Sequence, residues 1–136
     1  YFRKEQNMGK SPRIKVLIVD DHQVVREGLR KILEMDKQIQ VIGEAQSGEE
    51  AIVKTNSLAP DVVIMDLKMP GMGGIVATHE IKNNRPDTNV LILTLYAEDF
   101  VKQAIEAGAS GYILKDSDIE QITKDTCLKC HMADSK

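Results

Sequence analysis

The sequence predicts an α/β fold in which a mostly parallel sheet of five strands carries helices on both faces. Residues 14–19, 62–65 and 90–93 are nearly continuous aliphatic or β-branched runs, which is typical of strands buried on both faces. Longer segments with helical spacing of apolar residues alternate with these runs, and this alternation indicates parallel strands joined by right-handed crossovers. The 136 residues are enough for one domain with a substantial core.

The five expected strands differ in strength. The runs at residues 14–19, 62–65 and 90–93 are the strong candidates. Residues 39–45 and 111–114 are weaker candidates, the second of them short. Because the helical patterns fall between these segments, each strand is expected to be followed by one helix.

The first two helices are indicated by periodicity and by a cap. Apolar residues recur at i, i+4, i+7 and i+8 from Val25, which marks one helix face. Residues 47–50, with the sequence Ser-Gly-Glu-Glu, form a capping box that opens the second helix. We expect that helix to run to about Leu58, ahead of Pro60.

Three more helices follow. The third is stopped near Asn84 by Pro86, the fourth ends at Gly108, and a second capping box at residues 117–120 opens the fifth. The residues expected to face the core from the third and fourth helices are Gly74, Ala77, Thr78, Ile81, Val101, Ala104 and Ile105.

Composition excludes several classes of protein. Apolar residues make up 42% of the chain and charged residues 29%, a balance that excludes wholesale disorder. No apolar run is long enough for a membrane span or for the core of a signal peptide, so no contact with a membrane is expected. The net charge of −3 makes the domain a poor match for nucleic-acid binding through its own surface. Two cysteines near the C-terminal end fit a cytoplasmic location.

One domain is expected over residues 13–125. Residues 1–12 form a polar tail, and Met8 looks like a natural start, so residues 1–7 are expected to be foreign to the natural protein. Residues 126–136 form an irregular polar tail that contains Cys127, Cys130 and His131. This spacing matches the c-type haem attachment pattern. Covalent haem would require export, so we interpret the match as coincidence, with a metal or redox role as the open alternative.

Several reactive groups are predicted to meet at one edge of the sheet. Asp20 and Asp21 end the first strand, Asp66 the third, Thr94 the fourth and Lys115 the fifth. In parallel sheets, binding sites form at the carboxyl ends of the strands. Three carboxylates a few ångströms apart repel each other by roughly several kcal/mol at an effective dielectric constant of about 20. A hard divalent cation would relieve this repulsion, and we expect Mg²⁺.

Such a site has the groups that phosphoryl transfer requires. A metal ion and an ammonium stabilise charge on the phosphoryl oxygens, and positioning does most of the rest. Asp66 is the best candidate nucleophile, because a carboxylate can carry a phosphoryl group as an acyl phosphate. Asp20 and Asp21 are better interpreted as metal ligands, and His22 as an exposed residue at a helix start.

These motifs together resemble one family. Residues 20–22 (Asp-Asp-His), 66–72 (Asp-Leu-Lys-Met-Pro-Gly-Met), Thr94 and 111–115 (Gly-Tyr-Ile-Leu-Lys) look like the receiver domain of two-component response regulators. The resemblance covers roughly residues 13–125. It implies the flavodoxin-like, CheY-like strand order 2-1-3-4-5.

The resemblance implies a role for each carboxylate. Asp66 would accept a phosphoryl group from the phosphohistidine of a sensor histidine kinase. Asp20, Asp21 and Asp66 would hold Mg²⁺, with the backbone carbonyl of Lys68 as a further ligand. The expected protein is therefore a signalling domain, whose only catalysis is its own phosphorylation and autodephosphorylation, rather than an enzyme.

The resemblance also implies a conformational switch. Thr94 would hydrogen-bond the phosphoryl group and Lys115 would pair with it. Tyr112 would turn inward when Thr94 is drawn toward the phosphate. The face made by the fourth helix, fifth strand and fifth helix would then repack, which is a population shift biased by new charge.

The wording of the motifs suggests a branch of the family. Residues 20–22, 93–96 and 111–116 resemble the NarL/FixJ-type, LuxR-tailed transcriptional regulators. Those proteins carry a helix-turn-helix DNA-binding domain after the receiver, and this chain ends before one, so DNA would be reached only through a domain absent here. Homodimer formation on phosphorylation is a further expectation. The alternative is a stand-alone receiver that acts by protein–protein contact.

Two other classes of protein are disfavoured by particular residues. A phosphohydrolase that uses an aspartyl phosphate, of the haloacid-dehalogenase type, needs a second acid two residues after the nucleophile, and here that residue is Lys68. A flavin-binding module would need a hydroxyl-rich phosphate loop after the first strand, where the sequence has Asp20 and Asp21. Both rivals are therefore less favoured than the receiver.

Overall fold

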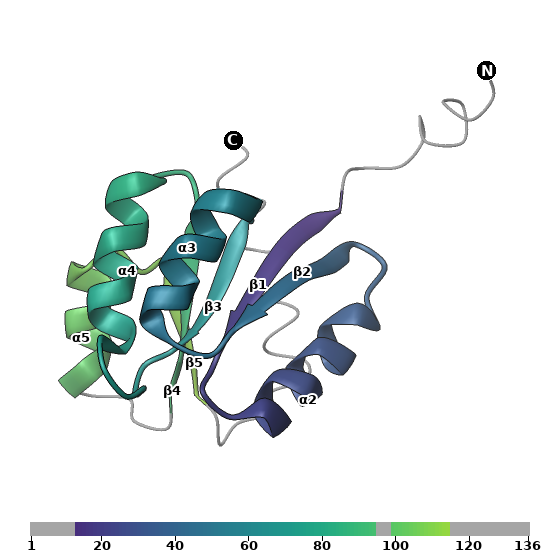
Figure 1. The fold of residues 1–136 in the computed structure, drawn as a ribbon, viewed down its shortest axis with the longest axis horizontal. Coiled ribbons are helices and arrows are strands. Elements are labelled where there is room, and N and C mark those ends of the chain that lie inside the picture. The colour runs from purple at the N-terminus through teal and green to yellow at the C-terminus, as the bar shows by residue number, and fades with distance from the viewer. Residues whose placement is uncertain (1–12, 95–98, 115–136) are drawn as a thin grey trace.

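The computed structural model describes residues 13–94 and 99–114, which form one α/β sandwich (Figure 1). The strands are β1 (Ile14–Val19), β2 (Ile39–Ala45), β3 (Val62–Asp66), β4 (Asn89–Thr94) and β5 (Gly111–Leu114). The helices are α2 (Gln23–Glu34), α3 (Gly48–Leu58), α4 (Gly73–Asn84) and α5 (Asp99–Glu106). Among these residues, no helix has the length and hydrophobicity needed to cross a membrane.

The five strands form one parallel sheet in the order β2-β1-β3-β4-β5. This confirms the predicted fold and strand order. Every residue of β3 and β4 is buried, as expected for central strands covered on both faces. Both strands extend beyond their apolar runs and include Asp66 and Thr94 as their last residues. The structure therefore buries these two polar side chains at the carboxyl ends of neighbouring central strands.

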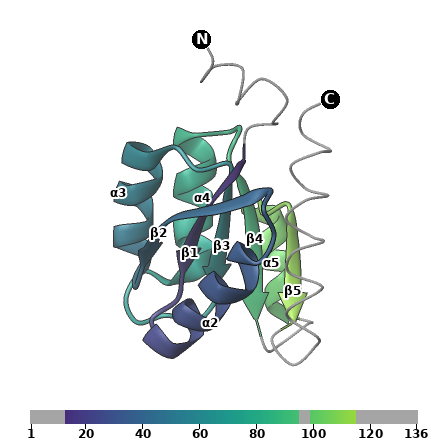
Figure 2. The same ribbon diagram turned by 90° about the vertical axis from the view of Figure 1, so that its right-hand side faces the viewer.

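Two cores lie on opposite faces of the sheet, beneath the helices that Figure 2 shows on either side of it. On one face, α2 contributes Leu29 and Leu33 to a core with alternate residues of the strands. On the other face, α3, α4 and α5 pack together, and their buried contributions include Ile81 and the small residues Ala51, Ala77 and Ala104. Small residues at these positions let the helices approach the sheet closely. The two layers of helices hold the strand ends in a fixed register.

Helix α3, the second helix that the sequence predicts, begins with a cap that differs in one hydrogen bond from the predicted capping box. The Ser47 hydroxyl accepts a hydrogen bond from the Glu50 amide at 3.1 Å, as a capping box requires. The Glu50 carboxylate accepts from the amide of Gln46 at 2.8 Å, one residue earlier than the reciprocal bond of a capping box. This backbone hydrogen bond, together with Lys54, holds the pKa of Glu50 below its ordinary value. The helix ends where Ala59 adopts φ 51°, ahead of Pro60.

The prediction of buried residues is only partly correct for α5, the fourth helix that the sequence predicts. Ala104 is buried as predicted, but Ile105 is 47% exposed. The helix is short, and of its side chains that the structure describes, Ala104 belongs to the core while Ile105 lies outside the buried face. The fifth predicted helix, from residues 117–120 onward, lies outside the described residues.

β2 contains a β-bulge at Ile42. Val16 of β1 pairs with Val41, whereas the next residue, Leu17, pairs with Gly43. The extra residue shifts the alternation of side chains along β2 by one position. Residues beyond the bulge therefore face the opposite side from the one that the first half of the strand would predict.

Candidate functional site

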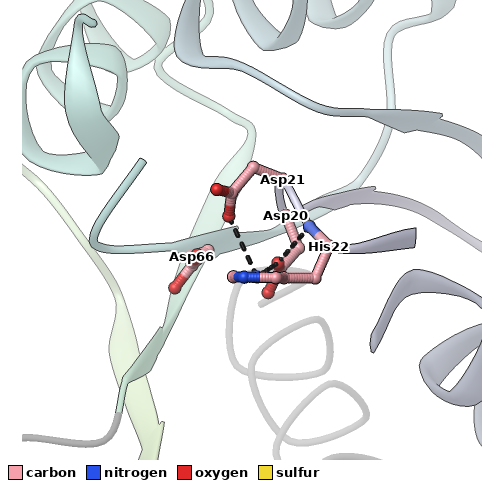
Figure 3. A group of neighbouring side chains, drawn as sticks. All are labelled: Asp20, Asp21, His22 and Asp66. Carbon is pink, nitrogen blue, oxygen red and sulfur yellow. Dashed lines mark hydrogen bonds and ion pairs between the residues drawn. The ribbon is translucent and has the colours of Figure 1, made fainter. Parts of the chain in front are cut away.

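The carboxyl ends of β1 and β3 bring an acidic cluster together (Figure 3). Asp20, Asp21, His22 and Asp66 each offer one ligand atom, and these atoms all lie within 4.8 Å of one another. The first two follow β1 directly, and Asp66 is the last residue of β3, the strand that pairs with β1. The parallel pairing of β1 and β3 therefore brings these three carboxylates together, as the sequence predicted.

Two of the three carboxylates are held away from water. Asp20 is fully buried and Asp66 is 4% exposed, while the Asp21 side chain is partly exposed. Buried carboxylates are expensive unless they are paired or bind a metal ion. The Oδ1 atom of Asp21 is buried, and the polar group described next to it is the ring nitrogen Nδ1 of His22 at 3.1 Å. Oxygen ligands of this kind are those that Mg²⁺ prefers, so the donor set fits a hard divalent cation.

His22 is exposed at the start of a helix, as predicted, but it also contacts the acidic cluster, which was not predicted. Its backbone amide donates to Asp20 Oδ1 at 2.8 Å. Its ring Nδ1 lies 3.0 Å from Asp20 Oδ1 and 3.1 Å from Asp21 Oδ1. The imidazole side chain is nonetheless 65% exposed and immediately precedes α2. It therefore covers the solvent side of the two carboxylates.

Three of the other predicted site residues belong to the part of the chain that the structure describes. Thr94 is buried at the end of β4, next to β3. Lys68 is exposed two residues after Asp66. Tyr112 is on β5 and is 45% exposed. Lys115, predicted to provide the ammonium, lies outside the described residues.

The backbone at Asp66 is fixed by the start of α4. The amide of Gly74 donates to the carbonyl of Leu67 at 3.0 Å. The Thr78 hydroxyl donates to the Gly74 carbonyl at 2.7 Å. A Cβ atom at Gly74 would lie only 2.3 Å from the carbonyl oxygen of Asp66, which is far inside van der Waals contact. Glycine at this position is therefore what lets the helix pack on the strand end.

An ion-pair network supports the other side of the cluster. Glu44, near the end of β2, accepts from Arg26 Nε at 2.9 Å and from Arg30 Nε at 2.8 Å. Partial burial would raise the pKa of Glu44, but the two arginines outweigh it and hold that pKa below its ordinary value. The guanidinium of Arg26 also donates to the backbone carbonyl of Asp20 at 2.7 Å. Sequence reasoning missed this network, because its members are 14 to 18 residues apart in sequence and carry no motif.

Comparison with known proteins identifies the family. The model of the response regulator receiver domain matches residues 16–126. The transcriptional regulatory protein YdfI of Bacillus subtilis is 47% identical over 118 residues, which cover 85% of this chain and 55% of YdfI. The chain belongs to the family of response regulator receiver domains of two-component systems. It spans about half the length of the curated relatives that it matches.

Solved structures narrow the branch. The signal receiver domain of the response regulator NarL from Mycobacterium tuberculosis has a TM-score of 0.84 and 32% identity, covering 90% of this chain and 98% of that one. A LuxR-family two-component response regulator from Aurantimonas sp. SI85-9A1 has a TM-score of 0.81 and 37% identity, covering 87% of this chain and 85% of that one. The homologues of this chain are thus NarL/LuxR-family response regulators, as the motif wording predicted.

Proposed function

We propose that the acidic cluster is a magnesium-dependent phosphoacceptor site with Asp66 as the residue that is phosphorylated. The observation that carries this proposal is the convergence of three carboxylates at the ends of β1 and β3, in a chain of the receiver family. Asp66 is the one carboxylate of the three that lies within a strand, as the last residue of β3 between β1 and β4. Its carboxylate is therefore held on a rigid element, which suits a nucleophile.

The reaction needs one bond to form and one to break. A carboxylate oxygen of Asp66 attacks the phosphorus of a phosphohistidine on a sensor histidine kinase. The phosphorus–nitrogen bond breaks, the histidine leaves as a neutral imidazole after taking up a proton, and an acyl phosphate remains on Asp66. Slow attack by water on the acyl phosphate then returns the carboxylate and releases inorganic phosphate.

The surrounding residues would hold the cation and the phosphoryl oxygens. Asp20, Asp21, Asp66 and the backbone carbonyl of Lys68 would bind Mg²⁺, which when bound neutralises charge on the phosphoryl group. The Thr94 hydroxyl would donate to a phosphoryl oxygen. The Lys115 ammonium would pair with another, and so stabilise the charge that the transfer brings into the site.

We test this function with a small phosphodonor. Incubation with acetyl phosphate and Mg²⁺ is expected to add one phosphoryl mass, as measured by intact-mass spectrometry. EDTA should prevent the addition, because the three carboxylates would then repel the incoming phosphoryl group as well as one another. Equal labelling with and without EDTA would contradict the metal's role, and no labelling in either condition would contradict the phosphoacceptor.

The switch that we propose rests on the pairing of β4 and β5. Ile92 pairs with Tyr112, and Thr94 lies two residues beyond Ile92 on the same strand. Because side chains alternate along strands, Thr94 and Tyr112 are expected on the same face of the sheet. The exposed Tyr112 ring is then placed to move inward when Thr94 shifts toward a phosphoryl group on Asp66.

Replacing Thr94 with alanine is expected to separate phosphorylation from the switch. Thr94→Ala should still accept the phosphoryl group, but the ¹⁹F NMR signal of fluorotyrosine at position 112 should no longer shift on phosphorylation. The matched control is Thr88→Ala, which removes another buried threonine whose hydroxyl donates to the Pro60 carbonyl, just before β4. An identical shift in Thr94→Ala and the wild type would refute the role of Thr94.

Membership of the receiver family supports proposals about the domain bounds, the location and the output of the protein. We infer that residues 13–125 form the receiver, flanked by tails at 1–12 and 126–136, and that it works in the cytoplasm. The output is transcription, reached through a DNA-binding domain outside this chain, since the relative YdfI is a transcriptional regulatory protein of which the chain covers about half. Phosphorylation would favour a homodimer through the face that Tyr112 belongs to.

A further inference from the structure

We propose that Arg26 is a positioning residue that holds the backbone of Asp20, and with it the carboxylate pair, in the geometry that binds the cation. This inference deepens the proposed function and rests on it. Arg26 lies in α2 and does not belong to the acidic cluster itself. It acts on the cluster through the carbonyl oxygen of Asp20, which accepts from its guanidinium at 2.7 Å.

Arg26 provides one of several contacts that hold Asp20 in place. The Asp20 amide donates to the carbonyl of Ala45 at the end of β2, at 3.0 Å. Its Oδ1 accepts from the amide of His22 at 2.8 Å. Its carbonyl leaves the strand ladder and would have to be satisfied elsewhere, because buried carbonyls without partners are costly. Arg26 supplies that hydrogen bond, so the peptide between Asp20 and Asp21 keeps a defined orientation.

Arg26 can do this because the bulge in β2 turns Glu44 toward α2. Before the bulge, Ile39 and Val41 pack in the core on the α2 side. After it, Ala45 packs in the core on the opposite side, so its neighbour Glu44 faces α2. There Glu44 binds Arg26 Nε and orients the guanidinium, whose other end reaches Asp20. The side chain of Arg26 is only 13% exposed, which limits its movement further.

Arg30 provides a matched control within the same network. It binds the second oxygen of Glu44 at 2.8 Å, and among the described residues its side chain contacts Glu44 and Glu34 rather than Asp20. Removing either arginine takes one positive charge from this region, which by itself would strengthen binding of a cation to the carboxylates. Only the loss of Arg26 also releases the Asp20 carbonyl. The charge effect and the positioning effect therefore have opposite signs, and the two variants separate them.

The experiment measures the affinity of the full chain for Mg²⁺ by titration calorimetry in wild type, Arg26→Met and Arg30→Met. We expect Arg26→Met to bind Mg²⁺ roughly tenfold more weakly, the lower end of what loss of a residue that orients metal ligands costs. Arg30→Met should bind as tightly as wild type or slightly more tightly. Raising the Mg²⁺ concentration should restore acetyl-phosphate labelling of Arg26→Met to the wild-type rate, which a general loss of folded protein would not allow.

Arg26→Lys keeps the positive charge and tests the same idea if Arg26→Met folds poorly. It should fall between wild type and Arg26→Met in Mg²⁺ affinity, because one ammonium cannot reproduce the two-ended contact of a guanidinium. If Arg26→Lys and a folded Arg26→Met bind Mg²⁺ like wild type, or if Arg30→Met weakens binding equally, the inference is wrong while the proposed function stands. A wild-type protein that binds no Mg²⁺ would overturn the proposed function instead.

Discussion

Asp66→Asn is expected to abolish labelling by acetyl phosphate, and this is the largest effect that the structure predicts. An amide oxygen is a far poorer nucleophile than a carboxylate and leaves no stable acyl phosphate. The substitution is nearly isosteric, so the buried end of β3 should keep its packing. It also removes one of three charged oxygen ligands, and Mg²⁺ affinity should fall by at least about tenfold for that reason. Intact mass and titration calorimetry measure the two effects.

Asp87→Asn is the control for that experiment. Asp87 is an exposed carboxylate in the segment before β4, away from the cluster formed at the other ends of the strands. The same chemical change there should leave both labelling and Mg²⁺ affinity at wild-type values. If Asp66→Asn were labelled as fully as Asp87→Asn, the phosphoryl group would reside on another residue, and Asp66 would be at most a metal ligand.

The fold was predictable from the sequence because its strongest signals are local. The buried runs at residues 14–19, 62–65 and 90–93 carry β-propensity and continuous hydrophobicity, and each became a parallel strand. Parallel pairing then brought Asp20, Asp21 and Asp66 to one edge without any further information. The strand order came from the resemblance to receivers and not from the periodicity.

The remaining features depend on tertiary contacts that no local pattern reports. The bulge at Ile42 leaves no signature in a run that reads as an ordinary strand, yet it decides that Glu44 faces α2. The guanidinium that contacts Asp20 is also bound by Glu44, so this contact involves two elements that lie far apart in the sequence. Ile105 has the helical spacing of a core residue but is half-exposed. The prediction failed there because spacing alone does not report how wide the buried face of a helix is. Positioning groups are therefore harder to predict than the groups they position.

Gly74→Ala is the second large effect, on stability rather than chemistry. The new Cβ would lie 2.3 Å from the Asp66 carbonyl oxygen and 2.9 Å from Leu67 Cα, both of them backbone atoms. Relief requires α4 to move away from a central strand of the sheet, so we expect the free energy of unfolding to fall by about 2–4 kcal/mol. The displacement should also slow labelling of Asp66 in the folded fraction, since it disturbs the backbone that carries the nucleophile. Urea denaturation gives the stability, and intact mass gives the labelling rate.

Gly28→Ala makes the same substitution at a position where the structure predicts a rise in the free energy of unfolding. Gly28 lies inside α2, and a Cβ atom there would meet nothing within 4 Å. Alanine in a helix interior is favoured over glycine by about 0.5–1 kcal/mol, so this variant should be slightly more stable than wild type and labelled normally. The contrast removes helix propensity as an explanation, because both glycines are helical. If Gly74→Ala were also stabilised, the start of α4 would have room to move, and its packing could not be what holds Asp66 in place.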